Sequence, residues 1–165
     1  MPPTCAIALC PWWRCLADVG VKLLNGRAVE IGGVGFVGVK GFAGGGRYTL
    51  SSFGEPAIRA VVAESVDETM RLENAMRQVR ASRSMVVLRY APITVAVVGE
   101  PPEIFPFLGS SRLAETIDRF KVDAVAHGHA YRGGYEGRPP AGAPVFNVAA
   151  HIEKPAGKPY ALIDL

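Results

Sequence analysis

An alternation of short apolar runs with helical segments constrains this chain more than any other feature of its sequence. Apolar side chains recur at a helical period from Pro56 to about Ala81, and a proline suits the first turn of a helix. The apolar runs Met85–Tyr90 and Val122–Ala126 predict buried strands. A second helix is expected between them, from about Ser111 to Phe120. This order of elements is typical of an α/β fold.

Further β-type runs flank this central pattern. They are Val21–Leu24, Ala28–Ile31, Val34–Val39, Val145–Ala149 and Tyr160–Leu165. Asn25-Gly26 separates the first two runs and predicts a hairpin there, because type I′ turns need positive φ at both central residues. Few helices separate the closing runs, so part of the sheet should be antiparallel. We expect a layered α/β architecture with mixed sheets.

Composition excludes several classes of protein. The chain has 165 residues, of which 49% are hydrophobic and 20% charged, as expected for one globular domain. The net charge of +3 comes with no basic run, so nucleic-acid binding is not expected. No apolar stretch is long enough to span a membrane.

The first eighteen residues form an atypical N-terminal segment. They hold all three cysteines, Cys5, Cys10 and Cys15, and no acidic residue before Asp18. The odd cysteine count argues against a disulfide framework, and the spacing matches no zinc pattern. The segment lacks the positive start of a signal peptide, so a cytoplasmic location is expected.

Two histidines follow the predicted strand Val122–Ala126 directly. His127 and His129 flank Gly128, and ligands in α/β sheets gather at such strand ends. The pair could bind a metal ion, or the imidazoles could cap backbone groups in a polar turn.

A glycine-rich pattern offers a competing interpretation. Residues 33–38 satisfy G-x-G-x-x-G, which in dinucleotide sites lies between a strand and a helix. Here it lies inside a β-type run and is followed by more glycine, which favours close-packed strands.

The histidine segment carries a resemblance to a known family. Gly128, His129, Ala130 and Tyr131 resemble the last metal motif of calcineurin-like metallophosphoesterases, Gly-His-x-His. Other stretches similar to one branch of that family are GFVGVKGFAG at 35–44, VLRYAP at 87–92, GEPPEIFPFLGSSRL at 99–113 and PVFNV at 144–148. The resemblance covers residues 19–165 and corresponds to the C-terminal portion of the family's domain.

The resemblance implies both a fold and an activity. The fold would have two stacked mixed β-sheets flanked by helices. The activity would be hydrolysis of a phosphoester substrate by a water or hydroxide activated between two divalent ions, often manganese, iron or zinc. This chain would be a partial version of that layered sandwich.

The metal ligands of the family are mostly missing. The first three family motifs have no counterpart, since no histidine precedes position 127. Arg89 stands where a histidine ligand is expected, and Tyr131 replaces the second histidine of the last motif. His129 is the matching ligand, His127 is a bystander or a substitute, and Asn147 is a near-site candidate by resemblance alone.

Two functions remain open on this reading. The chain is a metallophosphoesterase-like hydrolase domain that is inactive by itself, or a non-catalytic remnant that binds phosphate or protein. Arg89 could hold a phosphate bidentately or could be a solvated charge at a strand end. Missing neighbours should also leave a strand edge and an apolar face open, so self-association is expected.

Overall fold

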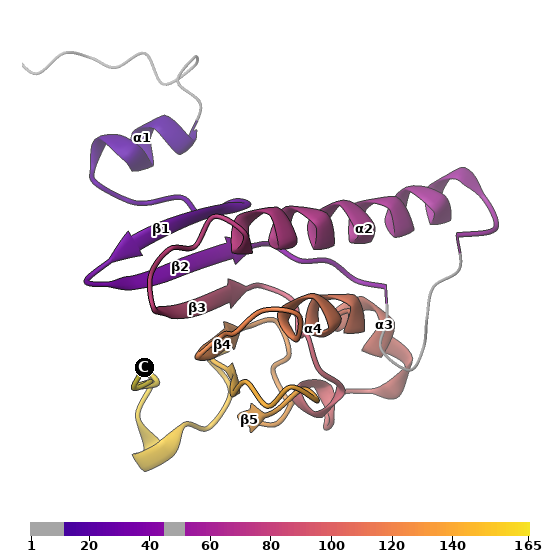
Figure 1. The fold of residues 1–165 in the computed structure, drawn as a ribbon. Helices are drawn as coiled ribbons and strands as arrows, with labels where there is room; N and C mark the ends of the chain where they lie inside the picture. The colour runs from indigo at the N-terminus through magenta and orange to yellow at the C-terminus, as the bar shows by residue number, and fades with distance from the viewer. Residues whose placement is uncertain (1–11, 45–51) are drawn as a thin grey trace, which may run out of the picture.

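The structure is a computed structural model that describes residues 12–44 and 52–165. Its centre is a six-stranded mixed sheet in the order β1-β2-β3-β4-β6-β5 (Figure 1). The four inner strands are mutually parallel, and the two edge strands pair antiparallel with their neighbours. The predicted α/β class with a mixed sheet flanked by helices is therefore confirmed, and the described strands form one sheet.

The described elements follow each other in the predicted alternation. The strands are β1 Arg27–Ile31, β2 Val34–Val39, β3 Arg83–Leu88, β4 Ala124–His127, β5 Glu136–Gly137 and β6 Val145–Asn147. The α-helices are α1 Trp12–Asp18, α2 Pro56–Met76, α3 Phe105–Leu108 and α4 Ser111–Ile117, and three 3₁₀ turns are η1 Thr94–Val97, η2 Pro102–Ile104 and η3 Pro155–Gly157.

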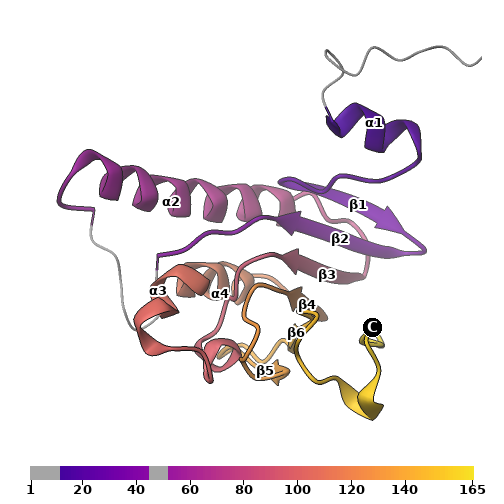
Figure 2. The ribbon, with the colours of Figure 1, turned by 180° about the vertical axis from the view of Figure 1, so that it is seen from behind.

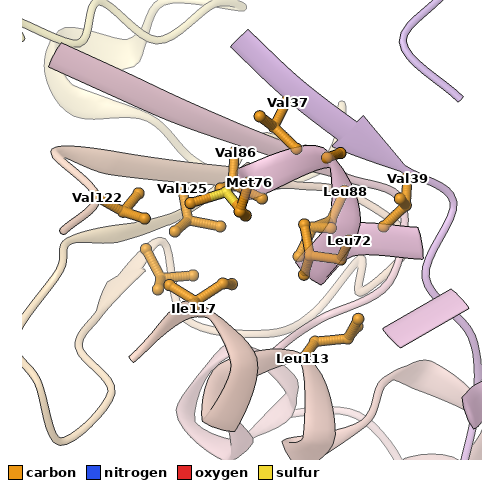
Figure 3. Packing of buried hydrophobic residues seen from close by; sticks show 12 residues of the cluster. Val37, Val39, Leu72, Met76, Val86, Leu88, Leu113, Ile117, Val122 and Val125 are labelled. Carbon is orange, nitrogen blue, oxygen red and sulfur yellow. The ribbon is translucent and has the colours of Figure 1, made fainter. Parts of the chain in front are cut away.

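Both helical connections of the parallel sheet cross the same face. Leu72 of α2 and Leu113 and Ile117 of α4 pack with Val37 and Val86 of the sheet into one buried core (Figure 3). The strands β2, β3 and β4 follow each other across the sheet, and right-handed crossovers between them place successive helices on one side. The larger of the two buried hydrophobic clusters in the described residues lies on this face of the sheet.

The second face of the sheet is less covered (Figure 2). Burial along β3 alternates, and Val87 on this face is 38% exposed. We predicted that the apolar strands would be buried on both faces, which holds for β4 but is wrong for β3. The reason is that α2 and α4 share one face, so apolar composition does not guarantee a second covering layer.

The hairpin at the start of the sheet uses a different turn from the predicted one. The chain reverses between β1 and β2 at Gly32-Gly33, where both glycines have positive φ, at 59° and 79°. Asn25-Gly26 also forms a turn, but no ladder joins residues 21–24 to β1. Leu24 instead packs over Gly38, at whose position any Cβ would clash with it. Residues 21–24 therefore pack on β2 and do not form a strand of the sheet.

The predicted strand Tyr160–Leu165 is also wrong. Residues 161–165 are assigned to no helix or strand, and Tyr160 and Leu162 are 53% and 76% exposed. Both sides of β6 are already occupied, by β4 and β5, so no free edge next to it remains to pair with this segment.

Other sequence predictions hold with shifted boundaries. α2 begins at Pro56 as expected and ends at Met76, earlier than Ala81. The G-x-G-x-x-G residues lie in the β1–β2 turn and in β2.

Cys15 is a free, exposed thiol, whereas Cys5 and Cys10 lie outside the described residues. Within the described chain, no helix has the length and apolar character needed to cross a membrane.

Candidate functional site at the carboxyl edge of the sheet

The four parallel strands end at one edge of the sheet and bring the candidate residues there. Lys40 follows β2, Arg89 and Tyr90 follow β3, and His129 follows β4. Backbone hydrogen bonds fasten these strand ends to each other. The Arg89 N–H donates to the Lys40 carbonyl oxygen at 3.0 Å, and the Gly128 N–H donates to the Arg89 carbonyl oxygen at 3.2 Å. Carboxyl ends of parallel strands are the usual ligand-binding edge of α/β sheets.

His129 lies in a strained backbone conformation at this edge. Its φ is +70°, which is uncommon for a residue with a side chain. The Ala130 N–H donates to the Gly128 carbonyl oxygen at 2.9 Å, which closes a three-residue turn centred on His129. A γ-turn with positive φ is the rare, strained form, and such strain concentrates at functional sites. The turn places a half-buried imidazole at the edge.

Arg89 and Tyr90 surround the His129 side chain. The Tyr90 ring meets the His129 ring edge-on, with centroids 4.8 Å apart, and the Arg89 guanidinium carbon lies 5.6 Å from the Tyr90 centroid. Burial and then the positive charge of Arg89 lower the pKa of His129, whereas Glu100 acts in the opposite direction. The structure therefore brings Arg89 and His129 together.

Arg89 is an exposed cation at this edge of the sheet. No carboxylate of the described residues forms an ion pair with it. Lys40, in contrast, contacts Glu64 at 2.6 Å, and this hydrogen bond lowers the pKa of Glu64. Glu100 is engaged too, because it accepts a hydrogen bond from the Arg132 N–H at 2.8 Å.

The loop after β2 is held to α2 by a buried carboxylate. Glu68 is 2% exposed and accepts a hydrogen bond from the Gly41 N–H at 2.9 Å. Arg71 contacts the other carboxylate oxygen at 3.0 Å. This charge-assisted bond fixes the strand end next to Arg89, and the sequence offered no signal for it.

His127 is a core residue. Its side chain is 1% exposed, and its Nδ1 lies 2.9 Å from the Gly128 carbonyl oxygen. A carbonyl oxygen only accepts, so Nδ1 carries the proton and Nε2 presents a lone pair. That Nε2 is buried and has no partner among the described residues. His127 and His129 therefore have different environments although only Gly128 separates them.

Asn147 holds the loop that follows His129 through buried hydrogen bonds. Its side chain is fully buried and its Nδ2 donates to the Ala130 carbonyl oxygen at 2.8 Å. Its Oδ1 accepts from the Ala149 N–H at 3.2 Å, and Ala96 contributes a longer contact of 3.5 Å. These bonds occupy both ends of the amide, so Asn147 positions the loop after His129.

Tyr131 packs against a histidine that the motifs did not single out. The rings of Tyr131 and His151 meet edge-on with centroids 5.1 Å apart. Sequence reasoning also missed Tyr90, although it lies within the VLRYAP stretch. The topology brings His151 to Tyr131, and no local spacing could have identified that pair.

The donor set does not fit two divalent ions. Across residues 12–44 and 52–165, no group of three or more His, Cys, Asp and Glu side chains is placed to hold a metal ion. Arg89 puts a permanent positive charge beside His129. His127, the other candidate ligand, is buried, with Nδ1 already engaged.

The buried imidazole predicts a pH-dependent stability. Burial lowers the pKa of His127 against the opposing effect of its Gly128 hydrogen bond, so on acidification the unfolded chain takes up the proton first. The contribution of His127 to stability is complete above about pH 7 and decreases as the pH falls through the unfolded value of about 6.5. Thermal unfolding between about pH 7.5 and 5.5 should show this slope, above the range where ordinary carboxylates titrate.

Two variants measure the part of that slope that is due to His127. His127→Gln should reduce the slope but not abolish it, because the pKa of His129 is lowered as well. His151→Gln, at an exposed position, should retain the full slope. An unchanged slope in His127→Gln would contradict the assignment.

Comparisons of the chain with protein-family models, with curated proteins and with solved structures found no match to any of them.

Proposed function

We propose that this chain is a phosphoester-binding domain of the calcineurin-like metallophosphoesterase type that does not hydrolyse its ligand by itself. Residues 19–165 correspond, on this proposal, to the C-terminal portion of such a domain, and its ligand is a phosphate group held at the carboxyl edge of the sheet. The observation that carries the proposal is Arg89, a cation without a carboxylate partner among the described residues, placed beside His129.

A bound anion would reduce the repulsion between Arg89 and a protonated His129 at this edge. The charge of Arg89 disfavours protonation of His129, and a bound phosphate would compensate both cations. The planar guanidinium matches two phosphate oxygens, and a protonated imidazole can donate a further hydrogen bond. The Tyr90 ring borders both groups and limits their freedom before a ligand arrives.

The absence of turnover follows from the residues at the family's ligand positions. Arg89 and Tyr131 replace two imidazoles, and the remaining His129 cannot hold two divalent ions. The chain's own residues can bind and orient a phosphate, but none of those described at this edge is placed to activate water for in-line attack.

Replacing Arg89 by glutamine should weaken phosphate binding by about 10- to 100-fold, because a hydrogen bond to a charged group contributes about 1.5–3 kcal/mol. Isothermal titration with inorganic phosphate at constant, low ionic strength measures this change. Arg89→Lys should be intermediate, since it keeps the charge and loses the bidentate geometry.

Arg59→Gln is the matched control. Arg59 is an exposed cation on α2, and its loss changes the net charge by the same amount. Equal weakening in Arg59→Gln and Arg89→Gln would mean that phosphate responds to overall charge, and the proposed site would be abandoned.

A further inference from the structure

The first strand of the sheet has one side without a partner. β1 pairs with β2 and has no strand on its other side in the described chain. The two-residue turn Gly32-Gly33 makes Ile31 and Val34 the closing hydrogen-bonded pair of the hairpin. The alternation of an antiparallel ladder then directs the N–H and C=O groups of Ala28 and Glu30 outward.

A hollow lies next to this open edge. The segment that leads from α1 to β1 passes beside the strand (Figure 1) without forming a ladder with it. A cavity of about 700 Å³ is lined by residues of this segment and by the first half of β1. Among the lining residues, Val21 and Leu23 are 47% and 40% exposed and alternate along the chain. An open strand edge that faces a partly apolar hollow is the geometry used for binding an added strand.

The charged residues that line the hollow are all of one sign. Lys22 and Arg27 line it, and no acidic residue does. Neither cation forms an ion pair with another residue in the described parts of the chain. Both side chains are exposed and can meet an incoming carboxylate.

We infer that β1 binds an extended peptide of a partner protein, with acidic side chains at alternate positions and apolar ones between them. The peptide adds a strand to the sheet by bonding to the outward backbone groups of Ala28 and Glu30. Its apolar side chains pack against Val21 and Leu23, and its carboxylates pair with Lys22 and Arg27. This inference does not depend on the phosphate site.

A second copy of this chain fits the hollow less well. If two β1 strands paired antiparallel about Val29, Arg27 of each would face Ile31 of the other, and Glu30 would face Ala28. Lys22 and Arg27 would then remain without opposite charges. An acidic peptide provides carboxylates for Lys22 and Arg27, which a second copy does not.

The probe is a synthetic peptide of about eight residues that alternates valine and glutamate, within the usual length of a strand. Backbone amide exchange by NMR on the full chain should slow at Ala28 and Glu30 by about tenfold or more when the peptide is in excess, because these amides become hydrogen-bonded. The same peptide with lysine in place of glutamate should bind about 2- to 30-fold more weakly, as expected when two exposed ion pairs are lost.

Glu30→Pro tests the backbone contact directly. Proline is tolerated on a strand edge where its missing N–H faces solvent, so the sheet should persist and peptide affinity should fall by about tenfold. Glu30→Gln keeps the N–H and should bind at least as well as the parent chain. Lys22→Glu should weaken binding, whereas Lys158→Glu, at an exposed site outside the hollow, should not.

Three outcomes would overturn the inference. They are equal affinity for the two peptides, protection that appears away from β1, and protection of Ala28 and Glu30 that rises with protein concentration without any peptide. The last outcome would assign the edge to a second copy.

Discussion

Replacing Leu72 by alanine is expected to lower the free energy of unfolding by about 2–5 kcal/mol. Leu72 is fully buried near the C-terminal end of α2 and packs in the core that joins α2 and α4 to the sheet (Figure 3). The loss combines the transfer free energy of the removed methyl groups with the cavity that remains. Chemical denaturation of the parent and variant chains measures the difference, provided that both are analysed with the same dependence of the free energy of unfolding on denaturant concentration.

Met70→Ala on the same helix is the matched control. Met70 is 51% exposed, so its removal should change the free energy of unfolding by less than about 0.5 kcal/mol. Comparable losses in the two variants would mean that the core does not lie between α2 and the sheet.

Replacing Gly133 by alanine is the second change with a large expected effect. A Cβ at this position would overlap the carbonyl oxygen of Ala96, which is backbone and cannot rotate away. The loop after His129 must move, and with it the contacts of Asn147 to Ala130 and Ala96. We expect destabilisation at or above the upper end of the usual range of about 1–3 kcal/mol for overpacking, together with weaker phosphate binding.

Gly128→Ala serves as its control. Gly128 has no positive φ, and a Cβ there would meet no other atom within 4 Å. Thermal unfolding of both variants compares their stability, and phosphate titration of Gly133→Ala tests the link between this loop and the site. A stable Gly133→Ala chain with unchanged phosphate affinity would show that this loop does not support the site.

The sequence was sufficient for the elements whose periodicity extends over many residues. The helical period in 56–76 and the apolar runs of β3 and β4 predicted the central alternation. Turn chemistry alone could not choose between Asn25-Gly26 and Gly32-Gly33, because both dipeptides favour the required backbone. In the structure the hairpin turn lies at Gly32-Gly33, and Leu24 packs over Gly38 of β2, a contact between segments that local turn patterns do not encode.

The residues of the candidate site could be predicted only where they directly follow an apolar run in the sequence. His127-Gly128-His129 and Arg89 follow apolar runs and could be found from the sequence. Their different environments could not, since His127 is buried and His129 only half-buried although one glycine separates them in the sequence. The contact between Tyr131 and His151 likewise arises from tertiary structure.

Phosphate binding at the carboxyl edge is tested most directly by titrating the chain with p-nitrophenyl phosphate while recording amide and phosphorus NMR spectra of one sample. We expect saturable shifts at Arg89, Tyr90, Gly128 and His129, and no inorganic phosphate formed over time. Spectra without shifts at those four residues would contradict phosphate binding at the carboxyl edge. Release of inorganic phosphate that is abolished in His129→Ala would instead show that the chain is itself a hydrolase.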